Sequence, residues 1–490
     1  MGMRYISTRG NSPPVSFAEA VTLGMAPSGG LFVPEKIPIV DFSKLAGMPY
    51  QEIAVNTLTP YMDGFDKSEI ESCVNEAYTP DSFDIPSVVS TVPIGNNLHI
   101  LELWHGPTAA FKDVALQIMP QFMRYSKIKS GDNSHTMILV ATSGDTGKAA
   151  LEGFKNRAGI SIAVFYPHGG VSEVQRLQMA TTDGSNTRVI AVRGNFDDCQ
   201  NGVKALFCDE ALRNEAAGRG VKFSSANSIN WGRLCPQIVY YVKSYLDLVA
   251  AGAISYGDGI DFCVPTGNFG NILAGYYARG MGLPIRKLIC ASNRNNVLTD
   301  FFAGGVYDKN REFHKTMSPS MDILISSNLE RFLFELSGRD AGMVAGWYGS
   351  LAKTGSFSIG AGILEKTKEI IEAHWVDEST VLETIGTLYH ECGYVMDTHS
   401  AVAVAAVSGP GYKRDVPIIV ASTASPYKFS QDVLKGLGIA VDGDEFDAVR
   451  ILSSTGAGAV HRAVDGLNKK RVLHDRVIDI FGMRDEVRWF

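Results

Sequence analysis

Short apolar runs, repeated through the middle and later parts of the chain, constrain the fold more than any other feature of the sequence. The runs are rich in β-branched residues and alternate with glycine-rich turns and helical patterns. Buried parallel strands have this continuous apolar character, and their alternation with helices predicts an open α/β architecture in two lobes. In that architecture ligands bind at the carboxyl ends of the strands. The runs lie at residues 136–141, 161–165, 188–192, 261–264, 287–290 and 417–420.

The rest of the chain divides around this core, which we predict to span residues 96–440 with a mobile smaller lobe at about 130–240. Residues 1–95 carry turn signals and several late prolines, and are predicted to form an N-terminal cap domain. The segment 292–345 has weak periodicity and is interpreted as an insertion or a mobile segment. The charged residues 441–490 are predicted to form a C-terminal tail that covers the core.

Composition excludes several classes of function. The chain has 490 residues, 45% of them apolar, which is enough for two or three packed units. Its net charge of −7 supplies no basic field for nucleic acid or for an anionic membrane, so a small anionic ligand needs a local positive site. No run of roughly 18 apolar residues and no secretory signal is present, and we therefore expect a cytoplasmic protein. The seven scattered cysteines predict reduced thiols, and no metal-ligand spacing occurs.

Lys112 is the first candidate for chemistry. A loop with Pro and Gly at 105–110 delivers this lysine to the front of a helix predicted over 114–123. The positive end of the helix and the neighbouring Phe111 both favour the neutral, nucleophilic form of the amine. A neutral lysine can form an imine. An exposed lysine in the first turn of a helix is the alternative that this stretch leaves open.

The second candidate is the glycine-rich turn at 265–271, which follows one of the apolar runs and opens a helix. Backbone N–H groups in such a turn converge on a phosphate, and the helix dipole favours its charge. Each charge-assisted bond contributes about 1.5–3 kcal/mol, so several N–H groups can hold a phosphate although this loop has no Lys or Arg. The alternative is an ordinary strand-to-helix turn.

A third turn, at 141–150, also joins an apolar run to a helix. Lys148 suggests a nucleotide P-loop, but Thr142 stands where a glycine is required and Ala149 where Ser or Thr holds magnesium. A helix N-terminus with two hydroxyls suits a carboxylate instead, such as that of an amino acid. Plain capping of the helix by Ser143 and Asp145 is the alternative.

Two further polar segments complete the set. Residues 225–237 carry Asn and Ser side chains and Arg233, which can grip a phosphate through two parallel bonds. The run at 417–420 ends in hydroxyls, and such a hydroxyl can bind a ring nitrogen or cap the next helix. A solvated loop is the alternative for the first segment. Together, an imine lysine, a phosphate cradle, a carboxylate-binding turn and a ring-nitrogen hydroxyl are what pyridoxal phosphate chemistry uses.

The motifs resemble the threonine synthases, which are pyridoxal-phosphate enzymes of fold type II, the fold of the tryptophan synthase β subunit. One departure is Ser425, because the family often has His at this position. The resemblance extends in the same order over most of the chain, through residues 5–10, 28–31, 105–113, 143–147, 227–237, 265–271 and 422–424.

The resemblance implies conversion of O-phospho-L-homoserine and water to L-threonine and phosphate. We expect the protein to be a monomer or a homodimer. A phospho-lyase or dehydratase with the same cofactor is the alternative activity, and a scaffold without chemistry is a third interpretation. Arg233 is our candidate for the phosphate of the substrate. The resemblance implies Lys112 as the Schiff-base lysine, Gly267, Asn268, Phe269, Gly270 and Asn271 as the phosphate cradle, Thr423 at the pyridine nitrogen, and Ser143, Asp145 and Thr146 at the substrate carboxylate.

Overall fold

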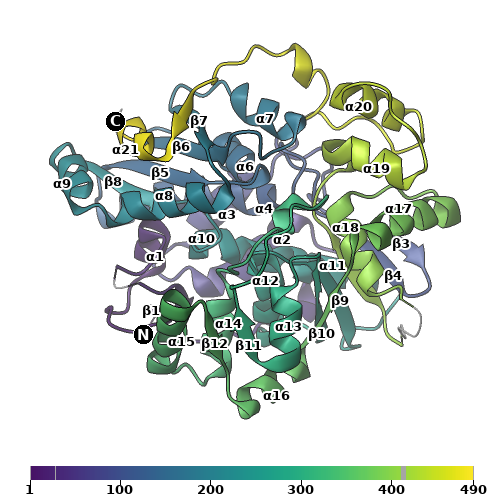
Figure 1. Ribbon diagram of the computed structural model, residues 1–490. Helices are drawn as coiled ribbons and strands as arrows, with labels where there is room; N and C mark the ends of the chain where they lie inside the picture. The colour runs from purple at the N-terminus through teal and green to yellow at the C-terminus, as the bar shows by residue number, and fades with distance from the viewer. Residues whose placement is uncertain (1, 28, 410–414, 489–490) are drawn as a thin grey trace.

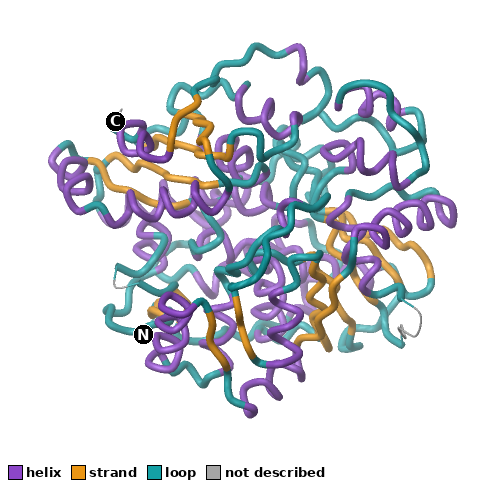
Figure 2. Tube along the Cα trace, in the orientation of Figure 1, coloured by secondary structure: helices purple, strands orange, loops and turns teal. Residues whose placement is uncertain are grey.

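Two sheets of mainly parallel strands organise the molecule, as the apolar runs predict (Figure 1). The structure is a computed structural model that describes residues 2–27, 29–409 and 415–488. Ser28, in one of the family-like motifs, lies outside the described residues. Figure 2 shows the strands in separate groups, with loops running between the two larger sheets.

The smaller sheet has five parallel strands in the order β15-β7-β6-β5-β8. Its side chains alternate between two cores, so both faces are covered. Ile138 and Val140 enter the core shared with the other lobe, whereas Met137 and Leu139 pack with helices α8 (Phe196–Cys208), α9 (Glu210–Gly218) and α21 (Met483–Glu486). The strands are β5 (His135–Ala141), β6 (Ile160–Pro167), β7 (Thr187–Arg193), β8 (Val221–Ser225) and β15 (Val477–Asp479).

The larger sheet has six strands in the order β13-β10-β9-β14-β4-β3, of which only the edge strand β3 is antiparallel to its neighbour. Ile418 and Val420 pack with helices α17 to α19, and Ile419 and Ala421 face the core that holds α11 and α12. The strands are β3 (Ser90–Gly95), β4 (Leu98–Glu102), β9 (Ile260–Pro265), β10 (Ile285–Ser292), β13 (Ile371–Trp375) and β14 (Ile418–Ser422).

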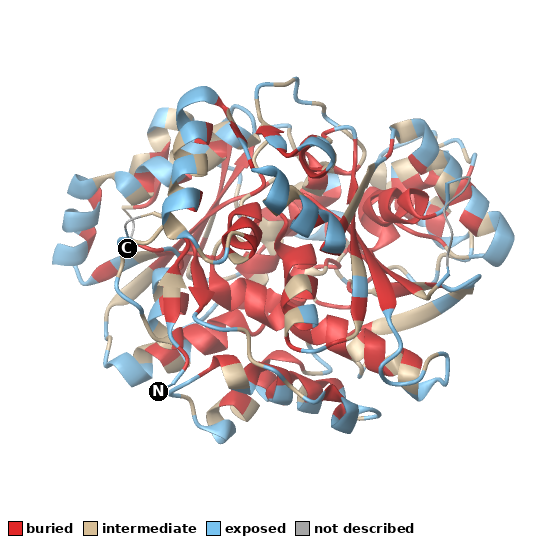
Figure 3. Ribbon diagram, turned by 90° about the horizontal axis from the view of Figure 1, so that it is seen from below, coloured by how far each residue is buried: buried red, intermediate tan, exposed pale blue. Residues whose placement is uncertain are grey.

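Helices cover the sheets and join them. Figure 3 shows that buried residues are concentrated in the sheets and in the helices between them. Around the smaller lobe lie α4 (Lys112–Leu116), α5 (Met119–Ser130), α6 (Asp145–Phe154), α7 (Glu173–Ala180), α8 (Phe196–Cys208), α9 (Glu210–Gly218) and α21 (Met483–Glu486). The larger lobe carries α10 (Trp231–Leu234), α11 (Ile238–Ala250), α12 (Gly270–Gly280), α13 (Val297–Gly304), α14 (Leu329–Leu336), α15 (Ala341–Thr354), α16 (Ala361–Ile370), α17 (Glu378–Cys392), α18 (Thr398–Ala406), α19 (Ser430–Gly436) and α20 (Glu445–Ser453).

The N-terminal segment packs against the larger lobe through aromatic side chains. Trp231, fully buried on α10, contacts the rings of Tyr5, Tyr61 and Tyr277 at centroid distances of 5.5, 5.5 and 5.2 Å. Burial of such large rings is among the strongest local sources of stability. The segment contributes β1 (Tyr5–Ser7), α1 (Phe17–Leu23), β2 (Phe32–Pro34), α2 (Tyr50–Leu58) and α3 (Lys67–Ala77).

Three elements differ from the sequence prediction. The helix expected over 114–123 is two helices, because α4 ends at Leu116 and α5 begins at Met119 with Pro120 in its first turn. The C-terminal tail does more than cover the core, since β15 adds a strand to the smaller sheet. The segment 292–345 contains β11 (Val306–Asp308), which pairs with β12 (Ser356–Ser358), and a short 3-10 helix (Pro319–Met321) that reaches the site described below.

The seven cysteines are all free, as predicted, and only Cys208 and Cys392 are exposed. Within the described part of the chain, no three His, Cys, Asp or Glu side chains are grouped to hold a metal ion. No helix in residues 2–27, 29–409 and 415–488 is long and apolar enough to cross a membrane.

Replacing Trp231 by Ala should destabilise the protein by about 3–5 kcal/mol, because the cavity would separate the N-terminal segment from α12. Urea unfolding followed by circular dichroism measures this change. Trp375→Ala is the matched control, since Trp375 is 49% exposed and its loss should change the free energy of unfolding by less than about 0.5 kcal/mol. Equal effects of the two substitutions would contradict the proposed anchoring role.

Candidate active site

Four polar segments follow the carboxyl ends of parallel strands and meet between the two sheets. The loop after β4 leads to Lys112, and the turn after β5 opens α6. The turn after β9 opens α12, and β14 is followed directly by Thr423. This is where open α/β sheets place their ligands, and all four segments were predicted from the sequence.

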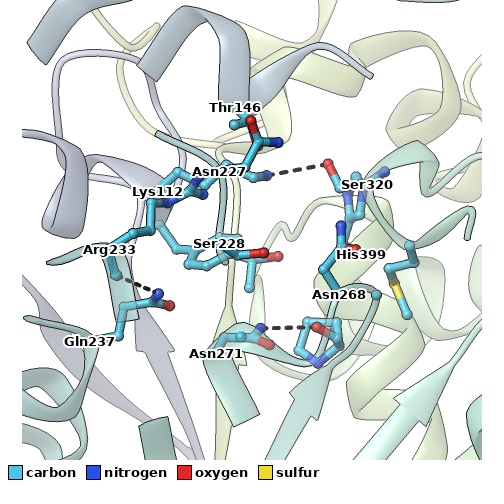
Figure 4. A pocket seen from close by; sticks show the side chains of 16 residues that line it. Lys112, Thr146, Asn227, Ser228, Arg233, Gln237, Asn268, Asn271, Ser320 and His399 are labelled. Carbon is cyan, nitrogen blue, oxygen red and sulfur yellow. Dashed lines mark hydrogen bonds between the residues drawn. The ribbon is translucent and has the colours of Figure 1, made fainter. Parts of the chain in front are cut away.

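One pocket collects most of the predicted site residues (Figure 4). The amine of Lys112 faces Ser320 across it, and Asn268 and Asn271 lie at its other end. Three predicted residues, Ser143, Asp145 and Phe269, are not in its lining. The predicted residues that line it are Lys112, Thr146, Arg233, Gly267, Asn268, Gly270, Asn271 and Thr423.

Lys112 is the first residue of α4 and is only 7% exposed, so the alternative of an exposed lysine is wrong. Its Nζ donates to Asp145 Oδ2 at 3.1 Å and to Ser320 Oγ at 3.4 Å, and it lies 4.8 Å from the centre of the Phe111 ring. Burial lowers the pKa of Lys112, and the Asp145 carboxylate opposes that effect. The amine is therefore poised for nucleophilic or basic chemistry.

Asp145 occupies the centre of a buried charge cluster. Its Oδ1 accepts bonds from Lys428 Nζ at 2.5 Å and from Gln175 Nε2 at 2.8 Å, while Oδ2 faces Lys112. Burial acts to raise the pKa of Asp145, but Lys112 and Lys428 outweigh it and hold the pKa well below the usual range. The carboxylate is thus engaged by two lysines beside the pocket.

The turn at the start of α6 is built by Thr142, and the alternative interpretation, capping by Ser143 and Asp145, is wrong. The N-cap residue is Gly144, and no side chain caps the helix there. Thr142 Oγ1 accepts bonds from the N–H groups of Gly144 and Gly147, both at 2.9 Å. Gly144 has φ of 131° and its Cβ would lie 2.4 Å from the Gln175 side chain, so only glycine fits. Thr146 lines the pocket, and Ser143 is half-buried beside it.

The turn at 266–270 approaches the 3-10 helix of Pro319–Met321 closely. A Cβ on Gly267 would lie 2.7 Å from the carbonyl oxygen of Ser320, which excludes other residues without a shift of the backbone. Phe269 is left-handed at φ of 60°, and its ring packs on Phe302 and Phe332 at 5.8 and 5.5 Å. Phe269 therefore contributes its backbone to the turn, while the first N–H groups of α12 have no intrahelical acceptor and favour an anion.

Thr423 connects the end of β14 to the lysine loop. Its carbonyl accepts from the N–H of Phe111 at 2.9 Å, and its N–H donates to Ser400 Oγ at 3.3 Å. The residue is 6% exposed and lines the pocket. Ser425, at the position where the resemblance leads us to expect His, accepts from the N–H of Tyr427 and caps the following 3-10 helix (Pro426–Phe429).

Arg233 is a buried cation at the edge of the pocket. It is 3% exposed, and its Nη1 donates to the carbonyl of Ala226 at 2.8 Å. Its Nε is buried and has no hydrogen-bond partner in the described structure, and burial lowers the pKa of Arg233 to about 10. A buried donor on a cation without an acceptor is costly, so this position is suited to an anion.

Three important residues were not predicted. Ser320 lies in the segment interpreted as an insertion, and its Oγ also lies 3.3 Å from Asp145 Oδ2. The Nε2 of His399 accepts from the Ser320 N–H at 3.1 Å, and its Nδ1 lies 2.7 Å from Asp397 Oδ2. Lys428 follows the family-like motif at 422–424, and no role was predicted for it from the sequence. No sequence signal identifies Ser320, whereas the Asp397 cap before an apolar helix marks the position of His399.

Comparisons with known proteins agree with this geometry. Residues 4–78 match the family model described as threonine synthase N terminus. A threonine synthase from Pseudomonas aeruginosa is 40% identical over 441 residues, which cover 89% of this chain and 91% of that protein. The chain belongs to the threonine synthase family. Human threonine synthase-like 1 is also 40% identical, over 86% of this chain and 58% of that protein. The solved structure of a PLP-bound threonine synthase from Brucella melitensis has a TM-score of 0.87 at 36% identity and covers 99% of each chain.

Replacing Thr142 by Val should lower the free energy of unfolding of this family member, because two buried N–H groups would lose their shared acceptor. Each unsatisfied group costs about 1–3 kcal/mol, and the start of α6 would shift together with Asp145. Denaturant unfolding measures the loss, and Thr142→Ser is the control because serine keeps the hydroxyl. If Val and Ser gave the same stability, Thr142 would not organise the turn.

Proposed function

We propose that this protein is a threonine synthase, which converts O-phospho-L-homoserine and water to L-threonine and phosphate with pyridoxal phosphate as its cofactor. The observation that carries the proposal is the convergence of the buried Lys112 amine, the first turn of α12 and Thr423 in one pocket. The family membership established above supports the same reaction.

The residues of the pocket fit pyridoxal phosphate. The Lys112 amine would hold its aldehyde carbon, and the backbone of residues 267–271 at the α12 N-terminus would hold its phosphate. The close approach of Gly267 to Ser320 leaves this cradle without a side chain that would fill it. The hydroxyl of Thr423 would meet the ring nitrogen. A hydroxyl at this position does not require a protonated ring, in contrast to a carboxylate.

When bound, pyridoxal phosphate withdraws electrons from the carbons next to the substrate amine and so stabilises negative charge there. The chain itself supplies the base. Lys112 Nζ, in its neutral form, accepts the proton from the α-carbon and returns a proton later. Asp145 and Ser320 orient this amine through the bonds of 3.1 and 3.4 Å.

Two groups are proposed to bind the substrate away from the reacting carbons. Arg233 would pair with the phosphate of the substrate through its unpartnered Nε. The turn of Ser143, Asp145 and Thr146 would face the substrate carboxylate, with the backbone and hydroxyl groups as donors, because the Asp145 side chain is engaged by lysines. Closure of the smaller lobe would exclude stray water from the intermediates.

We also propose that the protein acts in the cytoplasm as a monomer or a homodimer, without a nucleic-acid or membrane partner. The net charge of −7 supports this setting, because it provides no general attraction to polyanions.

The purified protein should release threonine and phosphate in equal amounts from O-phospho-L-homoserine. Lys112→Ala should abolish both products and the visible absorbance of the bound cofactor, because the reactive amine is lost. Chromatography of the amino acid and a colorimetric phosphate assay follow the two products together. Release of an oxo-acid instead of threonine would favour the phospho-lyase or dehydratase alternative, and full activity of the variant would refute the role of Lys112.

Arg233→Met should raise the KM for O-phospho-L-homoserine at least about tenfold, since a charge-assisted bond to the phosphate contributes about 1.5–3 kcal/mol. Steady-state kinetics at fixed pH measure this change, and the spectrum of the bound cofactor should stay that of the unmodified protein. Arg233→Lys is the control, which keeps the charge and should recover part of the affinity. An unchanged KM for Arg233→Met would place the substrate phosphate elsewhere.

A further inference from the structure

Lys428 is a second lysine at the centre of the site, and the mechanism above does not use it. It lies in the 3-10 helix Pro426–Phe429 that follows β14, and its side chain is completely buried. Its Nζ donates to Asp145 Oδ1 at 2.5 Å and to the carbonyl of Thr108 at 3.2 Å. It does not line the pocket, so it contacts the reactive lysine only through the shared carboxylate.

Asp145 is therefore shared between two cations with different positions. Lys112 binds Oδ2 and lines the pocket, while Lys428 binds Oδ1 and is not part of the pocket lining. Gln175 Nε2 adds a neutral donor to Oδ1 at 2.8 Å. The two oxygens of one buried carboxylate are thus divided between the reactive amine and a lysine that the ligand does not reach.

This arrangement addresses a conflict in the charge balance of the site. Lys112 acts only after it has lost its proton, but a buried carboxylate with a single cationic partner resists the loss of that partner. If Lys112 were the only partner of Asp145, the neutral amine would leave the carboxylate buried and uncompensated. With Lys428 in place, Asp145 keeps a cation at 2.5 Å whichever form Lys112 has.

We propose that Lys428 is a positioning residue that serves as the permanent counter-ion of Asp145 and thereby allows Lys112 to become a neutral amine. The inference rests on the proposed function only in taking Lys112 as the reactive amine. According to this proposal, Lys428 favours the loss of the proton from Lys112, and it does so through Asp145.

The other charged groups around the amine are consistent with this assignment. Arg233 on α10 adds positive charge on the pocket side, and both Lys428 and Arg233 act to lower the pKa of Lys112, after burial itself. Asp113 on α4 is turned away and accepts from the N–H and hydroxyl of Thr108 at 2.9 and 2.6 Å. His399 on α18 is held by Asp397 and by the Ser320 N–H. Asp145 is the one carboxylate hydrogen-bonded to Lys112 in the described part of the chain.

A purely structural role for Lys428 is the competing explanation, because its bond to Thr108 also holds the lysine loop. Gln178 Nε2 supports the same carbonyl at 3.4 Å. Lys428→Gln separates the two roles, since the amide can still donate to Thr108 and Asp145 but carries no charge. Lys428→Arg keeps the charge and should restore the behaviour of the unmodified protein.

The test measures how the capture of pyridoxal phosphate by the full-length apoprotein depends on pH, from the rate at which visible absorbance develops. Capture needs the neutral amine, so its rate rises with pH through the pKa of Lys112. Lys428→Gln should move the profile by about one pH unit or more to higher pH, which is about tenfold in rate on the acid limb. The profile of Lys428→Arg should match that of the unmodified protein.

Lys148→Gln is the matched control. Lys148, on α6, is a half-buried lysine with its own carboxylate partner, Glu152 at 2.8 Å, and it lies outside the pocket. Its profile should match that of the unmodified protein. Circular dichroism checks the fold of each variant, and Lys428→Met replaces Lys428→Gln if the latter does not fold.

Asp145→Asn decides whether Lys428 acts through the carboxylate. In this background, adding Lys428→Gln should not move the profile to higher pH. The proposal is overturned if Lys428→Gln leaves the profile unchanged, if Lys428→Arg moves it as far, or if the shift to higher pH persists with Asp145→Asn. Threonine formation is measured separately, so a shifted profile in a protein that makes no threonine would reject the proposed function and retain the role of Lys428.

Discussion

The carboxylate of Asp145 is the interaction on which the site depends. A buried charge is tolerated only when it is paired and hydrogen-bonded, and here it is bound by Lys112, Lys428 and Gln175. These partners come from α4, from the segment after β14 and from α7, while Asp145 itself begins α6. One side chain therefore joins elements of both sheets around the Lys112 amine, and a shift of any of them changes the charges next to that amine.

The two sheets make this convergence possible because their strands deliver loops to a common space. β5 belongs to the smaller sheet and β4, β9 and β14 to the larger one, yet the segments after all four line one pocket or flank it. A shared apolar core joins the lobes behind the pocket, with Ile138 and Val140 on one side and Leu288 and Ile419 on the other. The geometry of the site is thus fixed by packing far from the chemistry.

Local sequence predicts the parts of this site that depend on local backbone structure. The apolar runs identified the buried strands, because continuous apolar segments reflect burial on both faces, and the glycine-rich turns after them marked the helix starts near the pocket. The domain boundaries and the mobility of the smaller lobe remain predictions.

Contacts between residues far apart in the chain could not be predicted from the sequence. Ser320 is 208 residues from Lys112 along the chain, and the bond between Lys428 and Asp145 spans 283 residues. Neither contact leaves a periodic or spacing signal.

The segment around Ser320 illustrates why weak periodicity does not imply a passive insertion. Its backbone forms the 3-10 helix Pro319–Met321, which contacts two neighbours, the Gly267 turn and the His399 side chain. A Cβ at Gly267 would strike the Ser320 carbonyl, and the Ser320 N–H needs the unprotonated Nε2 that the Asp397–His399 pair provides. The turn at 266–270 and the serine hydroxyl at Lys112 are consequently parts of one contact. A displacement of either the Gly267 turn or Ser320 would therefore change the surroundings of the Lys112 amine and the shape of the turn together.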